Sequence, residues 1–179
     1  MVYKFKFVSD EVVNFAREIE IDSENTFLQL RNAILDSVGY SKDDIDSFLI
    51  CDDDWEGHEE ITLEDMGSAS DTDIWLMEDT VLSELIEEEG QKLRFIFDYL
   101  TDRSFFMELT EIFPSKHLSE PFCTFKKGQA PLQSVSLEEF EKKIDKITAV
   151  QDDMDADFYG NDEFNPEELG EGFDDLSIN

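Results

Sequence analysis

The chain has 179 residues, 40% of them hydrophobic, and its 46 Asp or Glu against 14 Lys or Arg give a formal net charge of -32. Each phosphate contact needs a cation, so this balance excludes direct binding to nucleic acid or to an anionic membrane. The length is that of one domain with a tail, and 16 Phe, four Tyr and two Trp can supply its core.

Alternation of apolar and charged residues predicts that the chain opens with a β-hairpin. In residues 3–7 the aromatic side chains alternate with Lys, and in residues 18–22 the Ile side chains alternate with acidic ones. The polar faces of the two strands can therefore pair Lys with Glu and fix the register.

A helix and a short strand are expected next. The helix runs from about residue 26 to 38, with Asn25 or Thr26 as its cap and Gly39 at its end. Its apolar stripe consists of Phe27, Leu30, Ile34 and Val38. Residues 47–51 then read as a short buried strand that leads into an acidic turn.

The later elements are predicted to be a short helix and a second hairpin. The helix covers residues 80–89, with Asp79 as a cap and Gly90 at its end. The hairpin has its turn at residues 100–103. Its buried side chains are expected to be Leu93, Phe95, Phe97 and Tyr99 on one strand and Phe105, Met107 and Leu109 on the other.

The last elements are a strand at residues 122–125 and a helix that starts at a capping box of Ser136 and Glu139 and continues to Ile147. Hairpins mixed with helices favour an α+β fold, with a mixed or antiparallel sheet and the helices on one side. We expect one domain over residues 1–150. Residues 151–179 form an acidic tail, disordered or loosely docked, since residues 152–179 contain eleven acids and no base.

Nothing in the sequence indicates secretion or membrane insertion. No apolar run approaches the length of a membrane span, and the first residues alternate instead of forming a signal-peptide core. We therefore expect a cytoplasmic protein. Cys51 and Cys123 are too few and too isolated for a disulfide scaffold or a metal knuckle, and they read as small buried hydrophobic residues.

Three segments resemble a known family, the plasmid ORF-three-like proteins, named after an open reading frame of a root-inducing plasmid and also described as passenger proteins of insertion elements. The family patterns are like W-R-R-I in the first hairpin, L-H-x-x-I followed by G-W in the helix, and Y-x-Y-D-F-G-D in the late hairpin. At these places the chain has Phe15, Ala16, Arg17, Glu18 and Ile19; Leu30, Arg31, Ile34, Gly39 and Tyr40; and Phe95, Phe97, Asp98 and Tyr99.

The resemblance spans roughly residues 3–125. It implies an α+β fold with a β-grasp-like ββα opening, found in bacteria and archaea and on mobile elements, whose biochemical role is unassigned. The family's late hairpin continues D-W-x-H, whereas residues 102–105 of this chain contain neither Trp nor His. Any role that this Trp and His have in the family can therefore not be assigned to residues of this chain.

The best metal candidate is the acidic turn, because clustered carboxylates just past a strand can hold a hard divalent cation. Its ligands would come from Asp52, Asp53, Asp54, Glu56 and His58. The EF-hand pattern fails, since Leu63 stands where that loop needs a bidentate Glu. A chain so rich in acids forms such clusters by chance, so composition favours a solvated turn without a metal.

No motif for nucleophilic catalysis is present, and we predict neither a catalytic residue nor a cofactor. Asp98 and Asp102 could form an acid–base pair if burial raised the pKa of one of them. The alternative, which we prefer, is a turn carboxylate that caps backbone N–H groups and pairs with Arg103. Trp55 and Trp75 are candidate anchors for a partner, although a place at the edge of the core fits them too.

The leading interpretation is a non-enzymatic interaction module of an intracellular bacterial protein, which binds another protein, possibly a basic one, through that partner's basic or apolar surfaces. One alternative is a metal-dependent hydrolase built on carboxylates. Another is an acidic nucleic-acid mimic that occupies a DNA-binding protein. The sequence leaves the oligomeric state open.

Overall fold

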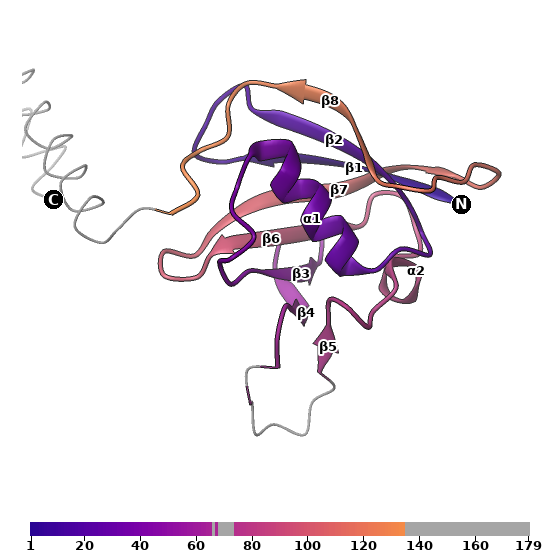
Figure 1. Cartoon of the computed structure of the whole chain (residues 1–179), viewed down its shortest axis with the longest axis horizontal. Coiled ribbons are helices and arrows are strands. Elements are labelled where there is room, and N and C mark those ends of the chain that lie inside the picture. The colour runs from indigo at the N-terminus through magenta and orange to yellow at the C-terminus, as the bar shows by residue number, and fades with distance from the viewer. Residues whose placement is uncertain (66, 68–73, 135–179) are drawn as a thin grey trace, which may run out of the picture. The chain divides into compact units, whose positions relative to one another are not determined.

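The computed structural model of the protein describes residues 1–65, 67 and 74–134, which form one sheet with two helices (Figure 1). The elements in chain order are β1 (Val2–Ser9), β2 (Ala16–Asp22), α1 (Phe27–Val38), β3 (Ser47–Cys51), β4 (Gly57–Thr62), β5 (Trp75–Leu76), α2 (Leu82–Leu85), β6 (Lys92–Asp98), β7 (Arg103–Phe113) and β8 (Phe122–Lys127). The strand order across the sheet is β5-β4-β3-β6-β7-β1-β2-β8. Among the described residues, the strand pairings are antiparallel except for that of β4 with β5.

The predicted α+β class is confirmed, with a mixed, mostly antiparallel sheet. The chain also opens in the predicted ββα order, while the likeness to a β-grasp fold stays a prediction. Neither described helix is long and apolar enough to cross a membrane. The helix predicted at residues 136–147 and the acidic tail lie outside the described residues.

The opening hairpin has the register that its charges indicate. β1 pairs with β2 so that Lys4 faces Glu20 and Lys6 faces Glu18. Because side chains alternate between the faces of a strand, Tyr3, Phe5 and Phe7 then share the other face, where they are buried. β7 pairs with the second edge of β1, which makes the first strand of the chain a central one.

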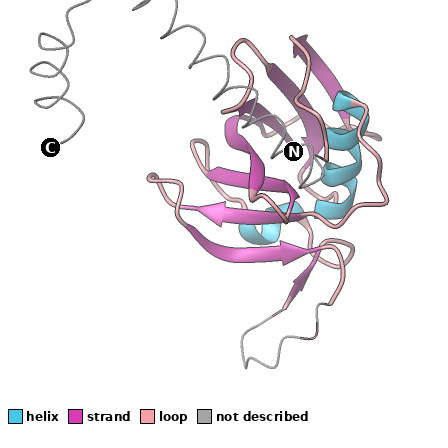
Figure 2. Cartoon of the chain, turned by 90° about the vertical axis from the view of Figure 1, so that its left-hand side faces the viewer, coloured by secondary structure: helices cyan, strands magenta, loops and turns pink. Residues whose placement is uncertain are grey.

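α1 begins and ends where its capping residues predict. The Thr26 side chain accepts from the Gln29 N–H and the Gln29 side chain accepts from the Thr26 N–H, which completes a capping box. Gly39 ends the helix in the left-handed conformation with φ 71°, which costs little without a Cβ. The helix lies against one face of the sheet (Figure 2). Its side chains Phe27, Leu30 and Ile34 are buried in the core.

The late hairpin carries the buried side chains that its alternation predicts, with one correction. All of the predicted positions on β6 and β7 are at most 2% exposed. Tyr99 is the exception: β6 ends at Asp98, and Tyr99 lies in the turn at residues 99–102 with 45% exposure. Asp98 causes the early end, because its carboxylate accepts from the Leu100 N–H at 3.1 Å and from the Thr101 hydroxyl at 2.9 Å.

The prediction of a helix over residues 80–89 is wrong in extent. α2 is a single turn, and Asp79 does not cap it. The Gln91 side chain takes the backbone groups that a longer helix would use: it donates to the Leu85 carbonyl at 2.7 Å and accepts from the Glu87 N–H at 3.1 Å. In a longer helix Glu84 would also share a face with Glu87 and Glu88, three and four residues further on, and like charges at this spacing repel.

The sequence did not predict two of the strands, β4 and β5. β4 has only Ile61 fully buried, since its other side chains are polar and the strand lies near the edge of the sheet. The acidic segment before it is therefore the turn of a β3–β4 hairpin. β5 has two residues and pairs with β4 in parallel.

Several residues of the family patterns hold the loops in place. Arg31 is buried and pairs with Asp46 at 2.7 Å. Arg17 is buried, has no carboxylate partner among the described residues, and donates to the carbonyls of Ala16, Ser37, Lys127 and Gly128 at 2.8–3.2 Å. The Tyr40 hydroxyl donates to the Pro131 carbonyl. These residues have structural contacts that account for their presence.

Candidate functional site

Both described helices lie on one face of the sheet, and no helix within residues 1–65, 67 and 74–134 covers the other face. Phe27 of α1 packs on Phe48, whose ring lies 4.9 Å from that of Phe95. The segment after α2 is on the same side, because the buried Tyr3 hydroxyl donates to the Ile86 carbonyl at 2.7 Å. We call the opposite face of the strands β6, β7, β1, β2 and β8 the open face.

One row of the open face alternates in charge. The registers place Glu18 opposite Lys6, Lys6 opposite Glu108, and Glu108 opposite Lys92. Opposite charges directly across a strand pair stabilise the sheet by roughly 0.2–1 kcal/mol each. The row thus carries both signs of charge on one surface of the sheet.

The neighbouring row is mostly apolar. Ala16 lies opposite Val8, and Val8 lies opposite Phe106. Phe106 is followed across the sheet by Arg94 and then by Leu49. Val8 is 39% exposed, so this row is only partly covered.

Trp55 folds from the β3–β4 turn onto the open face. Its ring meets that of Phe106 edge-on, with centroids 5.1 Å apart and an interplanar angle of 88°. The Lys92 ammonium lies 5.1 Å from the Trp55 ring, and the Arg94 guanidinium lies 5.6 Å from the Phe106 ring. We call these four side chains the Trp55 platform.

The acidic turn positions this tryptophan. The Asp52 carboxylate accepts from the N–H groups of Asp54 at 2.9 Å and Glu56 at 3.0 Å. Between them Trp55 has φ 67°, a conformation that a bulky residue adopts only where its surroundings hold it. The carboxylate that was a candidate metal ligand therefore serves the turn that presents Trp55.

Arg94 joins the platform to the β6–β7 turn. It donates to the Ser104 hydroxyl at 2.8 Å and pairs with Asp102 at 3.5 Å. Its Nε is buried and has no hydrogen-bond partner among the described residues. An unsatisfied donor on a side chain that is only 20% exposed leaves part of this cation's bonding capacity unused.

The structure separates the two carboxylates proposed as an acid–base pair. Asp98 caps its turn and lies 3.5 Å from Arg103, as the preferred interpretation predicted. Asp102 turns instead to Arg94 and is largely exposed. Arg103 also pairs with Glu11 at 3.0 Å and donates to the Gln133 carbonyl at 3.3 Å. It therefore joins the β6–β7 turn to the loop after β1 and to the segment after β8.

Asp52, Asp53 and His58 line one hollow beside the β3–β4 hairpin. The Asp52 carboxylate is already bound by the N–H groups of Asp54 and Glu56. Within residues 1–65, 67 and 74–134, no three His, Cys, Asp or Glu side chains are arranged to hold a metal ion. Trp75 is half-buried on β5 and donates to the Glu59 carboxylate at 3.1 Å.

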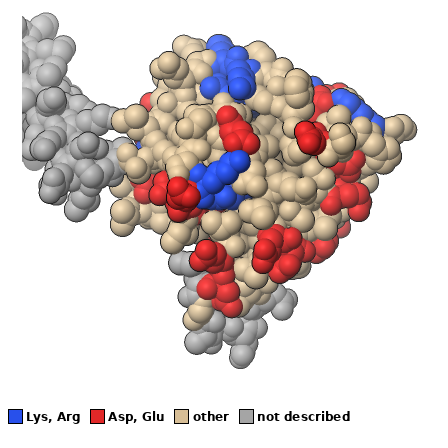
Figure 3. Space-filling model, in the orientation of Figure 1, with Lys and Arg blue, Asp and Glu red and all other residues tan. Residues whose placement is uncertain are grey.

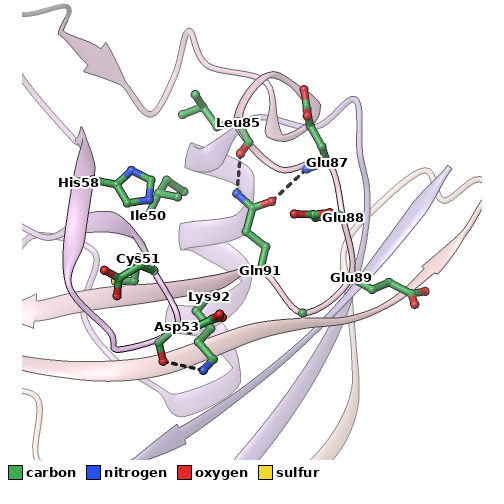
Figure 4. Close-up of a pocket in the computed structure, with 12 residues that line it drawn as sticks. Ile50, Cys51, Asp53, His58, Leu85, Glu87, Glu88, Glu89, Gln91 and Lys92 are labelled. Carbon is green, nitrogen blue, oxygen red and sulfur yellow. Dashed lines mark hydrogen bonds between the residues drawn. The ribbon is translucent and has the colours of Figure 1, made fainter.

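Acidic side chains are spread over the face that α1 covers, with few basic ones between them (Figure 3). They also line a hollow of about 580 Å³ between the β3–β4 hairpin and the segment from α2 to β6 (Figure 4). Lys92 lies at its rim and donates to the Asp53 carbonyl at 2.9 Å. The carboxylates of Glu87 and Glu89 point apart, and Glu89 accepts from the Ile112 N–H at 2.8 Å. Burial raises the pKa of the Cys51 thiol, which disfavours the reactive thiolate.

Sequence reasoning missed Phe106, Lys92 and Arg94. The signal was present: Lys92 and Arg94 occupy the polar phase of a strand whose other phase is buried. Phe106 stands in that same outward phase directly after the buried Phe105, where a polar residue is expected. Phe106 is therefore an outward-facing aromatic residue between Arg94 on β6 and Val8 on β1.

The family model described as plasmid pRiA4b ORF-3-like protein matches residues 5–172. Among solved structures, a protein of unknown function from Methanosarcina mazei Go1, MM3350, is similar with a TM-score of 0.60 and 19% identity, over 92% of this chain and 91% of that one. At this identity the likeness shows the fold alone. No curated protein matches this chain.

Proposed function

The chain belongs to the plasmid pRiA4b ORF-3-like protein family, and from its own surface we propose that it is a non-enzymatic module that binds another protein through the open face of its sheet. The observation that carries this proposal is the Trp55 platform. Tryptophan, arginine and other aromatic side chains are the residues that contribute most energy at protein interfaces. Here Trp55 is held in a costly backbone conformation and lies on Phe106.

The surroundings of the platform fit a protein partner better than a small molecule. The row of Ala16, Val8 and Phe106 continues the apolar area along the sheet. The alternating charges of Glu18, Lys6 and Glu108 border it. An apolar centre with a charged border is the usual organisation of a protein interface, in which the border contributes specificity.

The net charge of -32 indicates the sign of the partner. A strongly acidic protein attracts basic surfaces at long range and repels acidic ones. We therefore expect a partner with a basic rim and an apolar centre that covers Trp55.

The test isolates the partner and then removes the platform. The full chain would be purified with its bound proteins from its host, and the affinity of the identified partner measured by calorimetry. We expect Trp55→Ala and Phe106→Ala each to weaken binding about 30-fold, as for a residue worth ~2 kcal/mol at an interface. Trp75→Ala is the matched control, because Trp75 is the other half-buried tryptophan and lies on β5. Unchanged affinity in both platform variants would refute the proposal.

Two other functions would give different results in the same experiments. A nucleic-acid mimic would bind a DNA-binding protein and be displaced from it by duplex DNA, with a strong dependence on salt. A metal-dependent hydrolase would show a rise in melting temperature with one divalent cation at micromolar concentration, which Asp52→Asn and Asp54→Asn would abolish.

A further inference from the structure

β8 is an edge of the sheet. Within the described residues it pairs with β2 alone, so one row of its backbone N–H and C=O groups faces away from the sheet. Such an edge can pair with another extended chain unless the protein covers it. Figure 1 shows β8 along the upper border of the sheet, beside β2 and α1.

A bulge in β8 gathers its largest side chains on the open face. Glu20 faces Phe122, Glu18 faces Phe125 and Ala16 faces Lys127, with the irregularity between Glu18 and Ile19. Since residues 16, 18 and 20 lie on one face of β2, their partners on β8 do as well. Phe122 and Phe125 are 64% and 43% exposed, which is unusual for aromatic residues of a strand.

The end of β8 is basic in a protein that is otherwise acidic. Lys126 and Lys127 are exposed, and neither has a carboxylate within 4.0 Å in the described part of the chain. Lys4 and Lys116 differ, because both of them pair with Glu20. In Figure 3 basic side chains lie at the top of the molecule, over the border formed by β8.

A hollow accompanies the start of the strand. It has a volume of about 320 Å³ and lies between α1 and the segment that leads into β8. Its lining consists of Gln29, Asn32, Ala33, Asp36, Glu120 and Pro121. A strand edge beside a helix, with a pocket between them, is the arrangement by which some domains bind extended peptides: the edge pairs with the backbone and the pocket takes one side chain.

We propose that β8 binds an extended peptide segment of another protein as an additional strand. The segment has apolar side chains against Phe122 and Phe125 and carboxylates beside Lys126 and Lys127. A small polar side chain near its other end enters the hollow beside α1, which amide and carboxylate groups line. This occupant matches the charge, the exposed aromatic rings and the free backbone of the edge together.

Charge argues against a second copy of this chain as the occupant. Each copy has a net charge of -32, and two such molecules repel each other. A short peptide with two carboxylates meets mainly local charges, since remote ones are screened beyond roughly 8 Å at physiological salt. Edge lysines also disfavour pairing between identical edges in general.

This inference concerns a different surface from the Trp55 platform, and its test separates the two. A displayed library of random eight-residue peptides would be selected on the full chain at physiological salt, and the best peptide synthesised and measured by fluorescence anisotropy. Lys126→Glu with Lys127→Glu should weaken binding about tenfold or more, and Phe125→Ala several-fold. Trp55→Ala is the control and should leave the affinity unchanged.

Backbone pairing has its own readout. Only alternate N–H groups of an added strand face β8, so N-methylation of one alternate set should abolish binding while N-methylation of the other set is tolerated. Equal effects of the two sets, peptides without acidic residues, or no enrichment at all would each overturn the proposal. Dimerisation of the chain that Phe125→Ala abolishes, seen by sedimentation, would identify a second copy as the occupant instead.

Discussion

Replacing Arg17 by Lys tests how far one buried side chain holds the sheet edge to the helix. The guanidinium donates four hydrogen bonds to backbone carbonyls. The acceptors are Ser37 near the end of α1, Lys127 and Gly128 at the end of β8, and Ala16 beside Arg17 itself. It also lies 4.6 Å from the Phe15 ring. A lysine keeps the charge but has one nitrogen, so it can reach about two of these carbonyls. Two lost hydrogen bonds to a charged group, at ~1.5 kcal/mol each, give a destabilisation of about 3 kcal/mol.

The assay is urea or thermal unfolding of the full chain, where this loss lowers the melting temperature by roughly 6–12 °C. Amide exchange adds a local readout: β8 and the last turn of α1 should exchange faster while β6 and β7 remain protected. Val13→Ala, in the loop between β1 and β2 and 86% exposed, is the control and should change the free energy of unfolding by less than about 0.5 kcal/mol. A loss below about 1 kcal/mol for Arg17→Lys would mean that water satisfies the carbonyls, and the reasoning would fail.

Three further outcomes follow from burial, ionisation and net charge. Phe97→Ala should lower the free energy of unfolding by about 3–5 kcal/mol in chemical denaturation, because Phe97 is buried and its ring lies 4.7 Å from that of Phe105. Leu100→Ala is the control: at 91% exposure it should cost less than about 0.5 kcal/mol. Equal losses for the two variants would contradict the strand phase. Burial raises the pKa of the Tyr40 and Tyr99 hydroxyls, and the Glu60 carboxylate adds to the effect at Tyr99, so the unfolded chain loses these protons first. Stability should therefore fall as the pH rises past about 10, and an ordinary tyrosine titration of the folded protein at 295 nm would disprove this. The net charge of -32 should make the melting temperature rise between low and moderate NaCl, with Mg²⁺ and Ca²⁺ nearly equal at millimolar concentration; a preference for one cation at micromolar concentration would indicate a specific site.

The opening of the fold could be predicted because its signals are local. Alternation places Phe5 and Phe7 on one face, and Lys6 opposite Glu18 fixes the register. The capping residue Thr26 and the left-handed Gly39 mark the ends of α1 within one residue. Such signals depend on the nearest neighbours in sequence, so tertiary structure has little opportunity to override them.

The candidate site could not be predicted in the same way, since it depends on contacts between distant segments. Trp55 belongs to a turn whose sequence gives no periodicity, and its contact with Phe106 exists only because β3, β6 and β7 are neighbours in the sheet. α2 stops early for a similar reason: the Gln91 side chain, from the next loop, takes the bonds of a longer helix. Composition did identify the acidic turn, but its chemical role is to shape the turn around Trp55.

Charge and contact surface act over different distances in a protein of this kind. A net charge of -32 acts over about one Debye length and changes how often a basic partner arrives. The Trp55 platform acts only on contact, because desolvation of Trp55 and Phe106 requires a partner that excludes water. In the complex that we propose, salt would therefore alter mainly the association rate, and truncation of Trp55 would alter mainly the dissociation rate. The acidic surface would then bring basic partners to the molecule, and the aromatic rings beside Lys92 and Arg94 would select among them.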